Sequence, residues 1–264
     1  MSKIDTLFSQ DGHQCLRFSE LVEGEGIQAN QFLITHGDHA AVLDPGGDLT
    51  YTPLTIELSR QVNMESLDYV LASHQDPDII ASLPRWLMHT NCQVVTSRLW
   101  SRFLPHLSSN FVTGRLEQQL EERILALPDA GKAIPFGDSE LLALPAHFLH
   151  SVGNFSFFDP VSGILFSGDI GASVGGEEGE VSNFSDHKGH MLGFHQRYMA
   201  SGKACRLWAG MARKLQPSMI VPQHGGYFRG PEMVEAFLRW LEDLECGLDL
   251  MDQQSYRIPE HSAR

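Results

Sequence analysis

The chain has few cysteines and few basic residues. Cys15, Cys92, Cys205 and Cys246 lie far apart and form no CxxC pair. Neither a disulfide framework nor a cysteine-rich zinc site is therefore expected, and the thiols should be reduced. The formal net charge is −14 with the histidines neutral. Nucleic acids and anionic membranes bind basic surfaces, so we expect neither as a partner.

Long apolar runs are also absent. No stretch reaches the roughly 18 apolar residues that span a membrane. The N-terminal sequence MSKIDTLFSQDGHQC has no basic segment followed by an apolar one, an arrangement that would mark a signal peptide. We therefore expect a cytoplasmic protein, and its 264 residues are enough for one domain with a full hydrophobic core.

The apolar pattern predicts two sets of strands, each followed by helices. The expected strands are 14–21, a hairpin over 30–44, 67–72, 93–97, 140–146, 154–158, 163–168 and 218–222. The expected helices are 52–62, 79–90, 97–127, 190–199, 203–214 and 231–246. Segment 170–189 is rich in Gly, Ser and Glu, and we expect a mobile loop of the kind that covers a site. This order predicts an α/β (α+β) fold with two mixed sheets covered by outer helices, in a single domain over residues 1–264.

A histidine and two aspartates follow one of the predicted strands directly. In ASHQDPDIIASLPR, residues 72–85, His74, Asp76 and Asp78 occupy alternate positions before a helical segment begins. Alternate residues of an extended chain point the same way, so the three side chains can meet in one volume and hold a metal. A plainer interpretation is that Asp78 caps the helix, that Asp76-Pro77 forms a turn and that His74 is a surface histidine.

Three further histidine and aspartate residues favour the metal site. His150 lies in PAHFLHSVGNF, Asp169 ends GILFSGD and His224 ends SMIVPQHGG. Each follows or adjoins a predicted strand, and strand ends at one edge of a sheet form a common site. Together with the first stretch they would give two clusters of histidine and carboxylate, with one carboxylate free to bridge.

These residues form motifs that resemble a known superfamily. The patterns HxDxDxxxSLP, LHSxGNF, LFSGD and VPQHG resemble the metallo-β-lactamase superfamily. They are most similar to the di-iron domain of flavodiiron proteins and to stand-alone oxygen-binding di-iron proteins. The resemblance covers about residues 14–245 and implies an αββα sandwich. It implies that His74, Asp76 and His150 hold a first metal, that Asp78 and His224 hold a second, and that Asp169 bridges them.

The sequence departs from the family pattern at two positions. Hydrolytic members have histidine where Asp76 stands, and flavodiiron members have glutamate there. Both usually have histidine where Ile79 stands. Carboxylate oxygens suit iron or manganese better than the nitrogen-rich shells of zinc hydrolases. The loss of a histidine at Ile79 leaves the second metal short of a ligand and would make that side apolar, which favours O2 over water.

Other residues could orient the ligands. His147 is either a group that orients a ligand histidine, a ligand that replaces the missing one, or a plain structural or exposed histidine. His190, His195 and Tyr198 lie on the helix expected after the loop, and at least one of them could reach the site. We expect the remaining histidines to lie at the surface: His36, His39, His89, His106 and His187.

The resemblance implies a di-iron protein that binds or reduces O2 or NO, as an oxygen sensor or an oxygen-binding protein. Two iron ions are expected, with zinc or manganese as alternatives. No Gly-rich or Ser/Thr-rich segment suits the phosphate of a flavin, so we expect no flavodoxin domain and no bound flavin. A separate redox donor or signalling protein and a homodimer are also expected. Whether the protein is an enzyme stays open, and the alternative is a metal-dependent hydrolase of a thioester, lactone or phosphoester.

Overall fold

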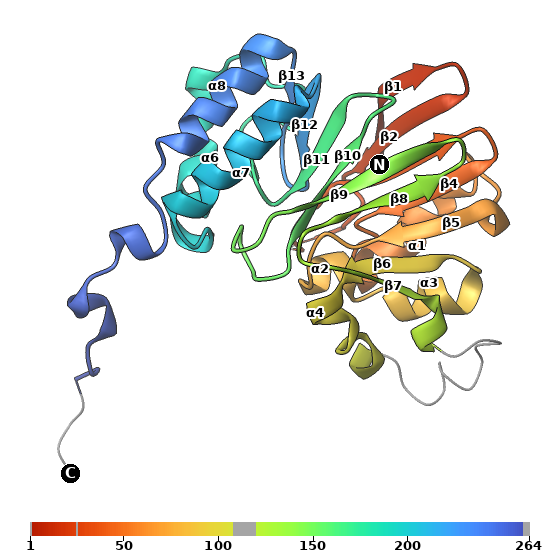
Figure 1. The fold of residues 1–264 in the computed structure, drawn as a ribbon, viewed down its shortest axis with the longest axis horizontal. Helices are drawn as coiled ribbons and strands as arrows, with labels where there is room; N and C mark the ends of the chain where they lie inside the picture. The colour runs from red at the N-terminus through yellow and green to blue at the C-terminus, as the bar shows by residue number, and fades with distance from the viewer. Residues whose placement is uncertain (1, 25, 108–119, 261–264) are drawn as a thin grey trace.

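Two β-sheets pack face to face and carry helices on their outer faces (Figure 1). The structure is a computed structural model, and it describes residues 2–24, 26–107 and 120–260. The strands are β1 (Lys3–Gln10), β2 (His13–Ser19), β3 (Gln31–His36), β4 (His39–Leu43), β5 (Leu67–Leu71), β6 (Gln93–Ser97), β7 (Ile124–Leu127), β8 (Lys132–Phe136), β9 (Ser139–Pro145), β10 (Phe155–Asp159), β11 (Ile164–Gly168), β12 (Met219–Pro222) and β13 (Phe228–Arg229). The α-helices are α1 (Asp48–Leu58), α2 (Pro77–Ile80), α3 (Leu83–His89), α4 (Arg98–Ser101), α6 (Phe184–Tyr198), α7 (Gly202–Leu215) and α8 (Pro231–Glu242).

The first sheet comes from the N-terminal half of the chain. Its seven strands lie in chain order from β1 to β7. Strands β1 to β4 pair antiparallel, with tight turns between β1 and β2 and between β3 and β4, whereas β4, β5, β6 and β7 pair parallel. Because parallel neighbours need crossover connections, α1 and α3 lie between successive strands. These helices cover the outer face of the sheet, where Leu54, Leu58 and Trp86 are buried.

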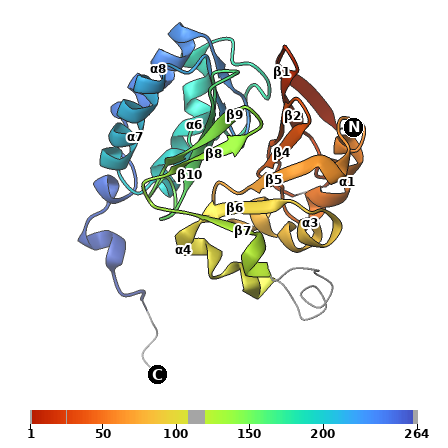
Figure 2. The same ribbon diagram turned by 45° about the vertical axis from the view of Figure 1, so that its right-hand side comes forward.

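The second sheet comes from the C-terminal half. Its six strands lie in the order β13-β12-β11-β10-β9-β8. Only β11 and β12 pair parallel, and helices α6 and α7 lie in the connection between them. Helices α6, α7 and α8 cover its outer face (Figures 1 and 2), where Trp208 and Phe237 pack against Leu165 and Ile220.

The main core lies between the two sheets. Successive strand residues point to opposite faces, so Phe32 and Ile34 of β3 face the second sheet while Leu33 faces the helices of the first. The rings of Phe32 and Phe166 meet across the interface with their centroids 4.9 Å apart. The predicted sandwich of two mixed sheets with outer helices is therefore confirmed.

Several predicted elements differ from the structure. In the described part of the helix expected over 97–127, only the start is α-helical, where α4 ends at Ser101, and 124–127 is strand β7. Residues 108–119 lie outside the described residues. Segment 170–189 is not loop throughout, because α6 begins at Phe184. Strands β1 and β8 were not predicted.

Within the part of the chain that the structure describes, no helix has both the length and the apolar character that a membrane crossing requires.

Candidate metal centre

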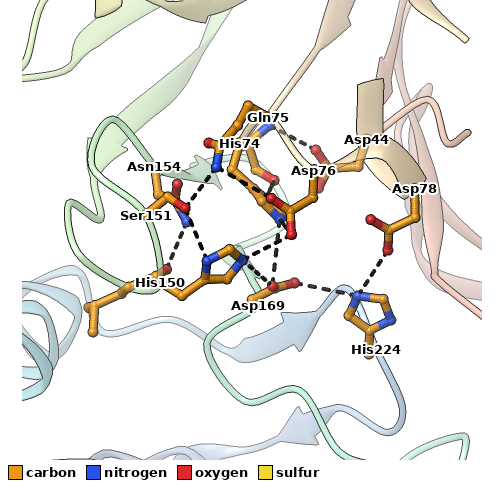
Figure 3. Close-up of polar contacts among 12 residues, drawn as sticks. Asp44, His74, Gln75, Asp76, Asp78, His150, Ser151, Asn154, Asp169 and His224 are labelled. Carbon is orange, nitrogen blue, oxygen red and sulfur yellow. Dashed lines mark hydrogen bonds and ion pairs between the residues drawn. The ribbon is translucent and has the colours of Figure 1, made fainter. Parts of the chain in front are cut away.

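Four connections at one end of the sandwich bring the six predicted side chains together (Figure 3). The connection after β5 supplies His74, Asp76 and Asp78, the last from the first turn of α2. The other three come from the loop between β9 and β10, from the end of β11 and from the end of β12; they are His150, Asp169 and His224. This convergence is the arrangement that strand ends at one edge of a sheet allow.

The first cluster consists of His74, Asp76, His150 and Asp169. One donor atom from each lies within 4.8 Å of the other three. The Nε2 atom of His150 is 3.0 Å from Asp169 Oδ2 and 3.3 Å from Asp76 Oδ2. The Nε2 atom of His74 is 3.5 Å from Asp169 Oδ2. Two imidazoles and two carboxylates at these separations can surround a single transition-metal ion.

Asp169 also faces a second, sparser cluster. Its other oxygen, Oδ1, lies 3.5 Å from Nε2 of His224, and that nitrogen is 3.5 Å from Asp78 Oδ2 (Figure 3). Oδ1 is buried and accepts no hydrogen bond from any described residue. Buried polar atoms rarely stay unpaired, so this oxygen is a natural acceptor for a cation. The carboxylate thus presents one oxygen to each cluster.

All three histidines turn the same ring nitrogen towards the centre. Nδ1 of His74 lies 2.9 Å from the hydroxyl of Ser73, and Nδ1 of His150 lies 3.1 Å from the hydroxyl of Ser151. Nδ1 of His224 donates to the carbonyl of Gln28 at 2.7 Å. With Nδ1 engaged outside the site, Nε2 of each ring is available for a metal, which is the usual support for a ligand histidine.

The charges at the site are mutually compensated in the first cluster. Burial acts to raise the pKa of Asp169, but His74, His150 and His224 hold it below its ordinary value. Burial acts to lower the pKa of His150, yet hydrogen bonds to Asp169 and Asp76 raise it to about 10. Positively charged imidazole therefore stabilises the carboxylates here, and a metal cation would take over that role.

The second cluster lacks such compensation. Burial raises the pKa of Asp78 despite the neighbouring His224. A carboxylate that is partly withdrawn from water and short of positive charge favours the binding of a cation.

A cavity of about 460 Å³ opens onto both clusters. Asp76, Asp78, His150, Asp169 and His224 line its floor, and its apolar lining includes Ile27, Ala172, Val174, Phe194 and Tyr198. Ile79 is not part of this wall. Its side chain is fully buried in the core beneath the first sheet's helices. The apolar character of the cavity comes from the other residues.

His147 has no free ring nitrogen. Its Nε2 donates to the carbonyl of Asp129 at 2.8 Å, and its Nδ1 accepts from the amide of Gly153 at 3.1 Å. It therefore braces the loop that carries His150, and in this position it is not available as a metal ligand.

The residues of α6 play different parts. Tyr198 lines the cavity, and its ring meets the ring of His150 in an edge-on arrangement with the centroids 5.8 Å apart. His195 is fully buried and contacts the loop after Asp169 through the amide of Gly171. His190 lies against the carbonyl of Val174, outside the cavity. The expectation that His187 is a surface residue is wrong, since it is 3% exposed.

Two residues near the site escaped the sequence analysis. Asp44 is buried beside it and accepts from the amide of Ser73 at 2.8 Å. Arg17 is fully buried and donates to the carbonyls of Glu178 and Gly225, two residues that line the cavity. Asp44 stood in a turn-like sequence, Asp-Pro-Gly-Gly, and Arg17 stood in a strand. Neither position carries a local signal of its contact with the site.

Comparison with known proteins places the chain in a family. The model of the "ODP family beta lactamase" matches residues 27–225. The chain belongs to this family. The expected resemblance to the metallo-β-lactamase superfamily and its oxygen-binding di-iron branch is therefore confirmed.

ODP structures match almost the whole chain. A structure described as the peroxy diiron species of the chemotaxis sensor ODP is 34% identical, with a TM-score of 0.82, and the match covers 94% of this chain and 97% of that one. The apo state of the chemotaxis sensor ODP from T. denticola is 35% identical, with a TM-score of 0.81 and coverage of 95% and 98%.

More distant relatives share part of their length with this chain. A flavo di-iron protein variant from Thermotoga maritima is 20% identical with a TM-score of 0.70, over 91% of this chain and 62% of its own. This likeness shows the fold alone. A Synechocystis protein that carries the name diflavin flavoprotein A 4 is 29% identical over 135 residues. These residues make up 43% of this chain and 23% of that protein. The match thus spans about a quarter of that curated relative.

Proposed function

We propose that this protein is a di-iron protein that binds O2 at the candidate metal centre. The observation that carries the proposal is the position of Asp169, whose two oxygens face two different clusters of histidine and carboxylate. His74, Asp76 and His150 would hold the first iron, Asp78 and His224 the second, and Asp169 would bridge them. The similarity to the peroxy diiron species of the chemotaxis sensor ODP supports the same assignment.

The donor set fits iron better than zinc. Three carboxylates and three imidazoles surround the two positions, and harder oxygen donors suit iron or manganese. Three negative charges against two divalent ions leave one net positive charge, which is a weak trap for anionic substrates. When bound, the metal pair would supply the electrons that O2 needs to bind.

The second position has fewer protein ligands than the first. Asp78, His224 and the shared Asp169 are the donors that the described residues bring to it. Ile79 follows Asp78 directly but has no donor atom and lies in the core. A metal held by so few groups keeps positions open for a small ligand.

The cavity wall suits a small apolar molecule. Val174 and Phe194 line it, and Tyr198 covers the His150 side. Apolar walls favour O2 or NO over water because burial of an apolar solute is favourable. The Tyr198 hydroxyl can remain in solvent contact while the ring covers the site, since the residue is 54% exposed.

We propose further that the protein acts as an oxygen sensor. A separate signalling protein would bind the O2-bound form, or a separate redox donor would reduce the centre. No flavin is part of the proposed site, and a homodimer is the proposed assembly.

The test uses protein loaded with iron and reduced without air. Iron content should approach two ions per chain, and rapid mixing with O2 should produce a new visible absorption in a stopped-flow instrument. A protein that binds iron but shows no absorption change with O2 would contradict oxygen binding.

The same preparation tests the alternative chemistry. A hydrolase predicts that zinc is retained in preference to iron and that a thioester, lactone or phosphoester is turned over. Hydrolysis would replace the proposed function under two conditions: Asp78→Asn abolishes the turnover, and the iron-loaded wild type shows no absorption change with O2.

A further inference from the structure

A second group of histidine, cysteine and carboxylate side chains lies at the other end of strand β11. His13 begins β2, Cys15 lies two residues later, and Asp159 ends β10 just before the turn into β11. Asp169 follows the far end of β11, and five strand residues at about 3.3 Å each separate the two groups by roughly 16 Å. The second group is therefore distinct from the candidate di-iron centre.

The three donor atoms of this group are close together and closed to solvent. Nε2 of His13 lies 2.7 Å from Oδ2 of Asp159, and Sγ of Cys15 lies 3.4 Å from the same oxygen and 3.7 Å from the same nitrogen. The residues are 2%, 0% and 1% exposed, in the order His13, Cys15 and Asp159. Among the described residues, only this group and the first iron cluster bring three or more such donors together.

These separations are close to those of a tetrahedral zinc site. Bonds of about 2.3 Å to sulfur and about 2.0–2.2 Å to nitrogen and oxygen place donors roughly 3.3–3.6 Å apart. Of the two distances that involve sulfur, the one to Asp159 (3.4 Å) lies within this range, and the one to His13 (3.7 Å) is slightly longer. The nitrogen–oxygen distance is that of a direct hydrogen bond, and a cation between the two atoms would replace this bond and widen their separation by roughly 0.6 Å or more.

His13 has the outer support that ligand histidines normally have. Its Nδ1 lies 3.0 Å from Nδ1 of His36, and Nε2 of His36 contacts the carboxylate of Asp138. With a metal on Nε2 of His13, its Nδ1–H donates to His36, and the Nε2–H of His36 donates to Asp138. Every ring nitrogen then has a partner, and both histidines are neutral.

A catalytic use of Cys15 is disfavoured by the same geometry. One nitrogen of His13 faces both the thiol and Asp159, whereas a cysteine nucleophile needs its histidine between the two groups. Burial raises the pKa of the Cys15 thiol well above its ordinary value. The thiol is therefore inert unless a metal displaces its proton.

We propose that His13, Cys15 and Asp159 bind one divalent transition-metal ion, with zinc as the ion that this donor set prefers. A thiolate and a carboxylate neutralise the charge of the cation, so the site can be fully buried. The hydroxyl of Ser162, which contacts both Cys15 and Asp159, would be the fourth donor. The ion would tie the β1–β2 hairpin of the first sheet to the β10–β11 turn of the second.

Cobalt(II) provides a specific test, because the proposed iron ligands include no sulfur. The full chain is stripped of metal with a chelator under reducing conditions and then given Co²⁺. A sulfur-to-cobalt charge-transfer band should appear in the near ultraviolet and should be absent in Cys15→Ser. The band should persist in Cys92→Ser and in the double variant Cys205→Ser/Cys246→Ser, whose cysteines lie elsewhere.

A zinc titration gives an independent readout. The wild-type chain should bind one zinc ion more than Cys15→Ser, and zinc should raise the unfolding temperature of the wild type more than that of the variant. Absence of the sulfur band in the wild type overturns the proposal, as does its persistence in Cys15→Ser. If Cys15→Ser does not fold, the two other cysteine variants decide: loss of the band in either one assigns it to those thiols and overturns the proposal.

Discussion

The imidazole of His195 accepts a hydrogen bond from the backbone amide of Gly171, two residues after Asp169. The distance from Gly171 N to His195 Nε2 is 2.9 Å, and Nδ1 of the same ring donates to the carbonyl of Met191 at 2.8 Å. Both ring nitrogens are therefore committed, and the ring must be neutral. Through this contact, α6 holds the loop that positions the carboxylate between the two clusters.

This contact predicts a loss of stability in acid. Burial lowers the pKa of His195 to about 4, from an unfolded value near 6.5. The unfolded chain therefore takes up the proton first, so stability is full above about pH 6.5 and falls by about 3 kcal/mol as the pH drops to 4. His195→Gln keeps a donor and an acceptor but cannot titrate. Urea unfolding of the metal-free variant should show a flatter pH dependence, while exposed His89→Gln should match the wild type.

The buried Asp44 predicts the opposite trend. Burial raises its pKa to about 7, so the folded metal-free protein prefers the protonated form. Its contribution to stability is full below about pH 3.8 and is lost as the pH rises through 7, by roughly 4 kcal/mol at most. Asp44→Asn retains the acceptor for the amide of Ser73 and should remove this loss. Exposed Asp38→Asn is the control, and an unchanged slope in Asp44→Asn would contradict the prediction.

The sequence was sufficient to predict the residues that meet at the centre because most of them lie in segments that directly follow strands. His74, Asp169 and His224 each follow an apolar run, and the ends of parallel strands share an edge. The sandwich was equally predictable from the order of its elements. What a single sequence did not show were contacts made by isolated residues with distant backbone, such as that of Arg17 with Gly225.

Local patterns also failed where pairing overrides propensity. Residues 124–127, ILAL, read as the end of a helix, but they pair parallel with β6 and bury Leu127 between the sheets. Ile79 has the sequence position of a missing ligand, yet its side chain packs in the core. In both cases the tertiary environment, which local spacing does not encode, determines the outcome.

Asp169→Ala should abolish binding of both irons. The residue is the only one among the six whose two oxygens face both clusters. Its removal leaves each metal one donor short and removes the charge that balances three histidines. Iron analysis after loading should therefore show near-complete loss, whereas exposed Asp11→Ala should bind iron normally. Full iron occupancy in Asp169→Ala would refute the bridging role.

Ile79→His tests the open position on the second metal. In the metal-free protein, an imidazole in this core should lower the free energy of unfolding by about 2 kcal/mol, since its nitrogens lose water without gaining partners. Iron should restore much of that loss if the ring turns to the metal, and the absorption change with O2 should be smaller or slower. Ile80→His, on the same short helix, should lose stability without recovery by iron. Equal behaviour of the two variants would rule out a ligand role for position 79.

Arg17→Met should lower both the free energy of unfolding and the affinity of the second position for iron. The guanidinium is fully buried and donates to Asp5 at 2.6 and 3.0 Å, to the carbonyl of Glu178 at 2.5 Å and to that of Gly225 at 3.2 Å. Removal of one partner from a buried charged network costs about 3 kcal/mol or more.

Because Gly225 follows His224 directly, the second iron should be lost more readily than the first, so iron analysis of Arg17→Met should approach one ion per chain at limiting iron. Arg85→Met removes an arginine that pairs with the exposed Asp48 and lies over the ring of Tyr51, both on α1. That change should cost less than about 1 kcal/mol and leave iron binding intact. An equal loss of both irons in Arg17→Met would mean that the arginine supports the whole cavity and has no particular connection with His224.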